Sequence, residues 1–401
     1  MNLRDFSRSG HWPTLLSAFV YFDVSFMVWV LFGALGVYIA QDFGLTSVRQ
    51  GLLVAIPLLG GALLRLPVGI AADRFGPRRA GMVAQLLVLV PLVWAWRVAD
   101  RLGELLVVGL LLGIAGASFA VALPLASRWY PPRHQGLAMG IAGAGNSGTV
   151  LAAFFAPRLA EAFGWRSVFG FALLPVLATL GLYALLARES PDQPPPKRFA
   201  EYLSVLSAVD TWRFSLFYTV TFGGFVGLAS YLPIFFYDQY GLSRVMAGNV
   251  TALCVFAGSF LRPAGGTLAD RFGGVRTLTL LYGAVGSLMF GMSLLPPLPL
   301  AAALLFCGMS GLGMGNGAVF QLVSQRFRRE IGVVTGIVGA AGGVGGFLVP
   351  FLIGVLKDLT GSYGSGFFVL SLVGFGSVGL LAYVQRSWRR TWAAVDMETA
   401  S

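Results

Sequence analysis

Twelve long apolar stretches alternate with short polar segments along the 401-residue chain. Six of them come first, at roughly 14–40, 49–71, 80–99, 105–127, 136–160 and 167–187. Six more follow a polar interval, at roughly 213–237, 246–268, 277–298, 300–325, 332–356 and 364–385. About 20 apolar residues are enough for an α-helix to cross a bilayer. The pattern therefore predicts an all-α membrane protein with twelve transmembrane helices.

The polar interval divides the chain into two sets of six. It includes the segment ESPDQPPPK at 189–197, whose prolines and charges cannot continue a membrane helix. We predict an N-terminal six-helix half at 1–187, a cytoplasmic linker at 188–212 and a C-terminal six-helix half at 213–401.

The composition excludes a soluble globular protein. The chain is 56% hydrophobic and only 11% charged, whereas soluble domains are about 25% charged. The many glycines are embedded in apolar runs, as in packed membrane helices rather than a β-barrel. Cys254 and Cys307 lie in apolar stretches without a CxxC motif or a nearby histidine. We therefore expect no metal site, no disulfide and no cofactor.

Positive charge is distributed unevenly between the loops. The net charge of +11 would suggest nucleic-acid binding in a soluble protein, but here the cations fall in short loops. The loops on the side opposite to the N-terminus contain only Arg49, Arg97, Arg101, Arg158, Arg166, Arg244 and Lys357. Cytoplasmic loops are enriched in Lys and Arg. We therefore expect both termini in the cytoplasm, a multi-pass protein of the cell inner (cytoplasmic) membrane surrounded by the lipid bilayer, and no nucleic-acid partner.

The two halves are related by an offset of 197 residues. RLPVGIAADRFGPRR at 65–79 aligns with RPAGGTLADRFGGVR at 262–276. The identical pairs include Arg65 and Arg262, Gly69 and Gly266, Asp73 and Asp270, and Arg74 and Arg271. A parallel repeat that holds substrate between its halves is the design of an alternating-access transporter. We predict such a transporter, acting as a monomer.

The repeated GxxADRFG segments lie at cytoplasmic helix ends. They resemble the loop signature of the major facilitator superfamily, which is present here in both halves. In this reading an Asp–Arg latch holds one conformation, with gating roles for Gly69, Asp73, Arg74, Gly266, Asp270 and Arg271. The alternative is an ordinary positively charged loop.

Few ionisable side chains lie deep inside the apolar runs. Arg65 and Arg262 occupy equivalent repeat positions, and Asp23 is the one acid well inside a run. Intramembrane charges are costly and usually face a functional cavity. With a single acid available, two facing arginines call for an anion, and their forked guanidinium groups suit a planar oxyanion. The alternative is that each arginine snorkels toward the cytoplasmic face.

The fifth and eleventh apolar runs are unusually rich in glycine, at 140–157 and 336–354. We interpret Gly143, Gly145, Gly342 and Gly343 as points of close helix approach that take part in the conformational change. Asn146 is the exception in this surface. A buried amide needs either a ligand or a partner helix, so both interpretations of Asn146 stay open.

The two arginines, the paired glycine-rich runs and the doubled loop signature together resemble the nitrate/nitrite porter family of the major facilitator superfamily. The resemblance spans essentially all twelve predicted helices. It implies that Arg65 and Arg262 clamp nitrate, that Asn146 contacts it, and that aromatic rings stack on it. The candidate rings are Phe32, Phe119, Tyr218 and Phe222. Gly342 and Gly343 depart from a symmetric site, which would carry polar groups there.

The mode of coupling stays open at this stage. Two buried arginines disfavour return of the empty carrier, which favours nitrate/nitrite antiport. Asp23 permits proton entry with the anion, and within the resembled family it favours nitrate/proton symport. We favour symport, with Asp23 as the proton-coupling residue. The alternative for Asp23 is a salt bridge or a helix-end hydrogen bond.

Other classes of protein fit less well. A membrane enzyme or sensor would need catalytic groups or an output domain, and His11 and His134 lie in cytoplasmic flanks. We therefore expect no enzymatic activity. A binding or scaffold protein of transporter ancestry, and a facilitator for another small anion or for a phosphorylated or carboxylated organic anion, are the remaining alternatives.

Overall fold

The computed structural model describes residues 6, 9–191, 204–327 and 331–398, so residues 192–203 of the predicted linker lie outside the described part. The helices of the first half are α2 (Trp12–Trp29), α3 (Leu31–Ala34), α4 (Gly36–Phe43), α5 (Ser47–Phe75), α6 (Pro77–Arg97), α7 (Leu102–Gly116), α8 (Phe119–Ser127), α9 (Pro132–Gly143), η1 (Ala144–Ser147), α10 (Gly148–Phe163) and α11 (Trp165–Leu186). Those of the second half are α13 (Val209–Tyr218), η2 (Thr219–Gly223), α14 (Gly224–Tyr240), α15 (Arg244–Phe260), α16 (Arg262–Phe272), α17 (Gly274–Ser293), α18 (Leu298–Arg326), α19 (Ile331–Thr360) and α20 (Gly364–Glu398).

Twelve helical segments of the described chain are long and apolar enough to cross a membrane. Several of the shorter helices join into single spans, namely Leu102–Ser127, Leu137–Phe163, Val209–Tyr240 and Arg244–Phe272. The predicted all-α fold with twelve transmembrane helices is thus confirmed.

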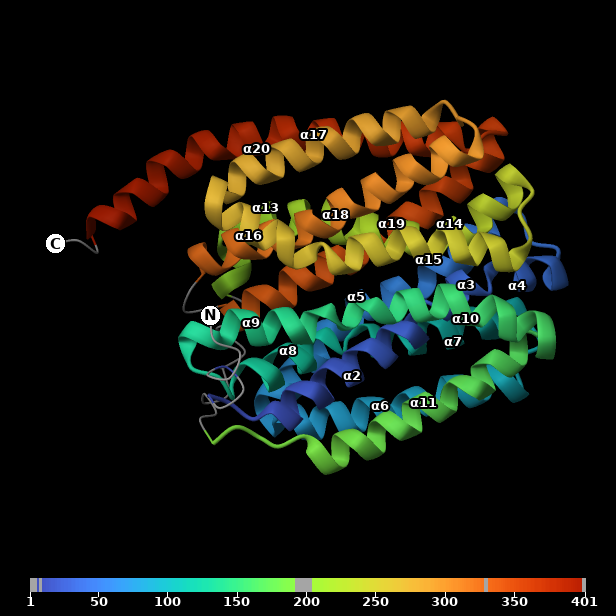
Figure 1. Ribbon diagram of the computed structural model, residues 1–401, viewed down its shortest axis with the longest axis horizontal. Coiled ribbons are helices and arrows are strands. Elements are labelled where there is room, and N and C mark those ends of the chain that lie inside the picture. The colour runs from blue at the N-terminus through green and yellow to red at the C-terminus, as the bar shows by residue number, and fades with distance from the viewer. Residues whose placement is uncertain (1–5, 7–8, 192–203, 328–330, 399–401) are drawn as a thin grey trace.

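The two halves lie side by side as two layers (Figure 1). Helices α6 and α11 form one outer edge of the bundle, and α17 and α20 form the other. Both ends of the chain lie at the same end of the bundle, which we call the terminal end. The opposite end, with the turns from α4 to α5 and from α14 to α15, is called the far end.

Glycines allow helix backbones to touch within and between the halves. A Cβ atom added to Gly148 in α10 would lie 1.7 Å from the carbonyl oxygen of Asp23 in α2. In the second half, a Cβ on Gly313 would lie 1.9 Å from the carbonyl oxygen of Gly258. Because membrane helices gain little from burying apolar side chains away from lipid, such close backbone packing stabilises the bundle.

We expect Gly148→Ala to destabilise the fold strongly. The new methyl group would overlap main-chain atoms of α2 rather than a flexible side chain, so the cost should exceed the roughly 1–3 kcal/mol of ordinary overpacking. The melting temperature of the detergent-solubilised protein measures this effect. Gly181→Ala in α11 is the matched control, because a Cβ there meets nothing within 4 Å. Equal melting temperatures for the two variants would contradict the packing argument.

At the far end, hydrogen bonds join the two halves. The carboxylate of Asp358 in α19 accepts hydrogen bonds from the main-chain N–H groups of Ser47 (3.1 Å) and Val48 (3.0 Å), at the start of α5. Close beside them, a Cβ on Gly354 would lie 2.4 Å from the carbonyl oxygen of Ser47. Gln41 in α4 also donates to the hydroxyl of Tyr237 at 2.7 Å. This end of the interface is therefore closed.

Several side chains at the terminal end form ion pairs within their own half. In the first half, Arg128 pairs with Asp73 at 2.8 Å. In the second half, Asp210 pairs with Arg213 at 2.9 Å and with Arg326 at 2.7 Å. These pairs stabilise each half separately and do not join the halves to each other.

Candidate functional site

Arg65 lies in the middle of α5 and is almost fully buried, with 1% of its surface exposed. Its Nη1 donates to the carbonyl oxygen of Gly339 in α19, and its Nη2 donates to that of Gly116 in α7 at 2.9 Å. One guanidinium thus joins the two halves through main-chain acceptors. Its Nε–H has no partner among the described residues.

Arg262 begins α16, directly after the helix break at Leu261. Pro263 follows it and has no N–H to donate, so the usual helical hydrogen bond is missing at this point. Arg262 Nη2 lies 3.5 Å from the hydroxyl of Tyr218, while its buried Nη1 has no partner in the described part of the chain. The arginine predicted from the second repeat therefore carries a free donor.

The two arginines meet at one aromatic ring. The guanidinium carbon of Arg65 lies 5.4 Å from the ring centroid of Phe119, and that of Arg262 lies 5.8 Å from it. Both distances are in the range of cation–π attraction. The equivalent repeat positions therefore converge in space, as the offset of 197 residues predicts.

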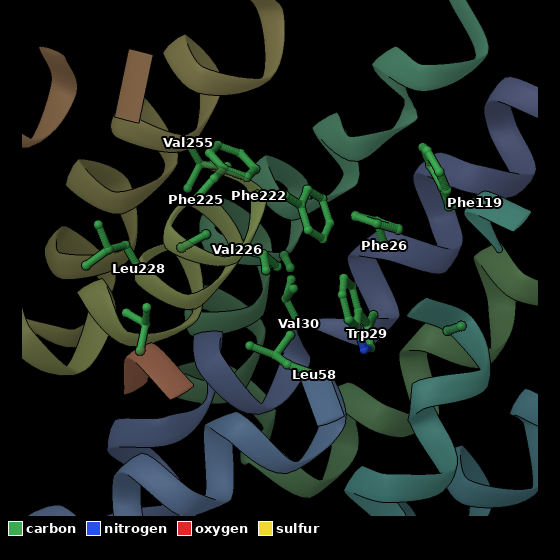
Figure 2. Close-up of a cluster of buried hydrophobic side chains, with 14 of the residues drawn as sticks. Phe26, Trp29, Val30, Leu58, Phe119, Phe222, Phe225, Val226, Leu228 and Val255 are labelled. Atoms are coloured by element: carbon green, nitrogen blue, oxygen red, sulfur yellow. The ribbon is translucent and has the colours of Figure 1, made fainter. Parts of the chain in front are cut away.

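Further rings complete an aromatic wall. Phe222 lies 5.5 Å from the guanidinium carbon of Arg65, and Phe320 lies 5.9 Å from that of Arg262. Phe222 also stacks on Tyr218, with ring centroids 5.1 Å apart and planes at 5°. Figure 2 shows Phe26 between Phe222 and Phe119, with Trp29 beside it. The predicted rings Phe119, Tyr218 and Phe222 thus lie together.

The fourth predicted ring lies elsewhere. Phe32 in α3 contacts Phe169 in α11, with centroids 5.4 Å apart. The next residue, Gly33, packs against the main chain of Ser230, whose carbonyl oxygen would lie 2.5 Å from an added Cβ. The structure does not bring Phe32 to the arginines, so Phe32 is not part of the candidate site.

The glycines of α19 make room for the rings. A Cβ on Gly342 would lie 2.6 Å from Tyr218 Cδ1 and 2.9 Å from Phe222 Cδ1. A Cβ on Gly343 would lie 2.9 Å from that of Ala62. A polar side chain cannot be accommodated at either position, which explains why the second half departs here from a symmetric site.

Asn146 is fully buried in η1, a 3₁₀ turn that interrupts the fifth transmembrane span. Neither its amide nitrogen nor its amide oxygen has a partner among the described residues. An unpaired buried amide costs roughly 1–3 kcal/mol. Among the described residues no interhelical hydrogen bond satisfies Asn146, so its amide is available to a ligand.

Asp23 faces the same turn from α2. Its carboxylate accepts a hydrogen bond of 2.6 Å from the hydroxyl of Ser147. Ser147 is the neighbour of Asn146 in sequence, so the acid is joined to the turn that carries the candidate amide. No described residue forms an ion pair with Asp23.

Helix breaks place many of these groups. The break between α7 and α8 precedes Phe119, η1 contains Asn146, the π-helical turn η2 contains Phe222, and the break at Leu261 precedes Arg262. Irregular backbone within a membrane is tolerated where protein surrounds it or where it lines a cavity, and π-helical turns are frequent at functional sites. Sequence patterns of apolar residues do not reveal such breaks.

Sequence reasoning missed two residues of α18. Phe320 contacts Arg262, and its ring also lies 4.8 Å from that of Tyr218. Asn316, one turn earlier, is fully buried with both amide atoms unpartnered among the described residues. The available signal was an amide inside an apolar, glycine-rich run, the same signal that identified Asn146.

The duplicated loop signature is used differently in the two halves. Asp73 pairs with Arg128, whereas Asp270 and Arg271 are exposed. Arg74 lies over the ring of Phe75, at 5.9 Å. The signature glycines have space around them, since Cβ atoms on Gly69 and Gly266 would have nearest neighbours at 3.5 and 3.9 Å. In the glycine-rich fifth run, Gly143 also has space, with a nearest neighbour at 3.9 Å. A nearest neighbour is much closer at Gly145, at 2.8 Å. Identical sequence therefore does not give identical contacts.

The centre of the molecule is electropositive. Within the described part of the chain, no acidic side chain forms an ion pair with Arg65 or Arg262. Arg65 is fully buried and Arg262 is partly buried, and such cations without a counter-ion are unfavourable in a medium of low dielectric constant. Each arginine also has a buried donor without a described partner, namely Arg65 Nε and Arg262 Nη1. The site is therefore suited to a small anion.

Comparisons with known proteins agree with this geometry. Residues 17–350 match the family model of the Major Facilitator Superfamily. The chain is 36% identical over 367 residues to the "Nitrite extrusion protein" of Bacillus subtilis, covering 90% of this chain and 91% of that protein. It is 34% identical over 385 residues to a "Probable nitrate/nitrite antiporter NarK1" of Thermus thermophilus, covering 88% and 86%. The crystal structure of a D-xylose–proton symporter has a TM-score of 0.73 at 17% identity, over 92% and 96% of the two chains.

A bundle of two six-helix halves around a central charged site is the architecture of a secondary transporter, and the chain belongs to the major facilitator superfamily. Within the superfamily it belongs to the nitrate/nitrite porter family, because these relatives are more than 30% identical over most of both chains. The resemblance of the sequence to this family is thus confirmed. The symporter shares the fold alone.

Proposed function

We propose that the protein carries nitrate, and also nitrite, across the cytoplasmic membrane by alternating access. The observation that carries the proposal is the pair of arginines, Arg65 fully buried and Arg262 partly buried, that share the ring of Phe119 without an acidic partner among the described residues. A planar oxyanion fits between aromatic faces while guanidinium and amide groups donate to its oxygens. The names of these relatives support this choice of anion.

The structure corresponds in this proposal to an inward-facing state. The terminal end faces the cytoplasm, in line with the distribution of Lys and Arg, and the far end, which Asp358 and its neighbours close, faces outward. The units 1–187 and 213–401 rock against each other as rigid bodies, and segment 188–212 links them on the cytoplasmic side. The protein acts as a monomeric transporter without enzymatic activity, cofactor or nucleic-acid partner.

Nitrate/proton symport is the coupling that we propose. It is supported by the hydrogen bond from Ser147 to Asp23, which joins a half-buried carboxylate to the turn that holds Asn146. A proton on Asp23 would accompany the anion through the cycle. Antiport of nitrate against nitrite is the alternative. It is favoured by the two arginines, because a carrier with two uncompensated charges between its halves reorients at a high cost when it is empty.

Counterflow in proteoliposomes tests the substrate. Vesicles loaded with unlabelled nitrate should accumulate labelled nitrate, and external nitrite should compete. Chloride and phosphate should compete poorly, because chloride has no oxygen atoms to accept the hydrogen bonds and phosphate is tetrahedral and larger. Preferential inhibition by phosphate or by an organic carboxylate would replace the proposal with a facilitator for that anion. Absence of any counterflow would favour a binding or scaffold protein.

We expect Asn146→Ala to raise the half-saturation constant for nitrate counterflow about tenfold. The lost amide leaves an anion oxygen without its donor, an effect of roughly 1–3 kcal/mol. Asn249→Ala in α15 is the matched control, since Asn249 also has a buried unpartnered amide oxygen but lies near the far end. A lower melting temperature with unchanged half-saturation would instead assign Asn146 to helix packing.

A further inference from the structure

Asn316 lies in a place where a membrane protein should not leave an amide unsatisfied. It is in the middle of α18, fully buried, and neither amide atom has a partner among the described residues. In a membrane-embedded core an unpaired polar group is more costly than at a water-filled surface. In this respect Asn316 matches Asn146, the other described asparagine that has no partner on either amide atom.

The neighbours of Asn316 place it at the depth of the arginine site. The adjacent Gly317 packs against Arg262, whose carbonyl oxygen would lie 2.2 Å from an added Cβ. Residues four apart share one face of a helix, so Asn316 lies on the same face as Phe320. The ring of Phe320 contacts Arg262, Tyr218 and Phe119. That face of α18 is therefore turned toward the centre of the molecule.

The internal repeat explains why an amide is needed there. With the offset of 197 residues, Asn146 aligns with Gly343, which packs against Ala62 and cannot be enlarged. The same offset aligns Asn316 with Phe119, so the second half has an amide where the first half has an aromatic ring. The ring of the second half that contacts Arg262, Phe320, comes one turn later. The second half thus exchanges the positions of ring and amide.

We propose that Asn316 is a second amide ligand of the transported anion, contributed by the C-terminal half in place of the group that is missing at Gly343. The inference rests on the proposed function. Together with Arg262 Nη1, which also has no described partner, the amide N–H of Asn316 gives the second half two free donors. They match the pair that Arg65 Nε and Asn146 supply in the first half. The anion is then held by one guanidinium and one amide from each half.

Two variants of Asn316 separate a ligand role from a structural role. Asn316→Ala removes the donor, and we expect the half-saturation constant for nitrate counterflow to rise about tenfold. Asn316→Asp keeps the size and an acceptor oxygen but places a negative charge beside the anion, so its loss should exceed that of the alanine variant. A purely structural amide predicts the reverse order, because the carboxylate can still accept a hydrogen bond.

The melting temperature of each variant, with and without nitrate, is measured in parallel. If Asn316 binds the anion, nitrate should raise the melting temperature of the wild type and of Asn249→Ala, and should raise that of both Asn316 variants much less. Half-saturation constants of both variants within about twofold of the wild-type value would overturn the inference while leaving the proposed function intact. Failure of the wild type to respond to nitrate would instead remove the proposed function, and the inference with it.

Discussion

Arg65→Lys should abolish nitrate transport in a protein that still folds. The guanidinium donates to Gly116 in its own half and to Gly339 in the other half, and its plane contacts Phe119 and Phe222. A lysine ammonium keeps the charge but loses the fork that makes these contacts at the same time. In the proposed function the guanidinium also donates to the anion, and loss of two such charge-assisted hydrogen bonds, at roughly 1.5–3 kcal/mol each, corresponds to a decrease of at least about a hundredfold in nitrate affinity.

The equivalent change in the second half tests the symmetry of the site. Arg262 has fewer protein contacts than Arg65, with Tyr218 at 3.5 Å and a free Nη1. We therefore expect Arg262→Lys to eliminate counterflow as completely as Arg65→Lys, but to lower the melting temperature less. Arg97→Lys, at an exposed helix end over Trp96, is the control and should behave as wild type. Wild-type transport by either site variant would remove that arginine from the binding site.

The fold and the meeting of the two arginines could be predicted because both follow from a pattern that repeats. Apolar runs of sufficient length have one stable solution in a membrane, which is a helix with its own hydrogen bonds satisfied. The repeat then places Arg65 and Arg262 symmetrically about the axis between the halves. Their shared contact with Phe119 is the physical outcome of that symmetry.

The aromatic wall was less predictable because ring positions depend on how each helix is rotated and where it breaks. The first span breaks at Val30 and Leu35, and Phe32 between these breaks contacts Phe169. Phe320 is one of 32 phenylalanines, and only the packing of α18 against α16 shows which way its ring is turned. Sequence gives the inventory of rings, whereas helix rotation selects those that meet the arginines.

Charges at helix ends were also difficult to assign. Asp73 and Asp270 occupy equivalent positions, yet Arg128 pairs with Asp73 while Arg326 pairs with Asp210. Asp210 also accepts a hydrogen bond of 2.8 Å from the indole N–H of Trp388. A long arginine side chain at a helix end reaches several acids, so small differences in helix position decide its partner.

Asp23→Asn should separate the two coupling mechanisms. The amide mimics a protonated carboxyl group and can still accept the hydrogen bond from Ser147, so the contact between α2 and η1 should persist. If Asp23 carries the coupling proton, acid outside the vesicle should drive nitrate into wild-type proteoliposomes, and acid inside should not. The variant should lose this pH-driven accumulation almost completely and retain nitrate counterflow, since exchange requires no release of the proton.

Asp42→Asn is the matched control for this experiment. Asp42 is an exposed carboxylate in α4, at the far end of the bundle, and it accepts a hydrogen bond of 2.5 Å from the indole N–H of Trp165. Its amide variant should keep both the pH-driven and the exchange activity. If Asp23→Asn accumulates nitrate with undiminished pH dependence, Asp23 is a structural hydrogen-bond acceptor of the first half. If the wild type exchanges nitrate for nitrite without proton movement, the two uncompensated arginines determine the cycle, and the protein is an antiporter.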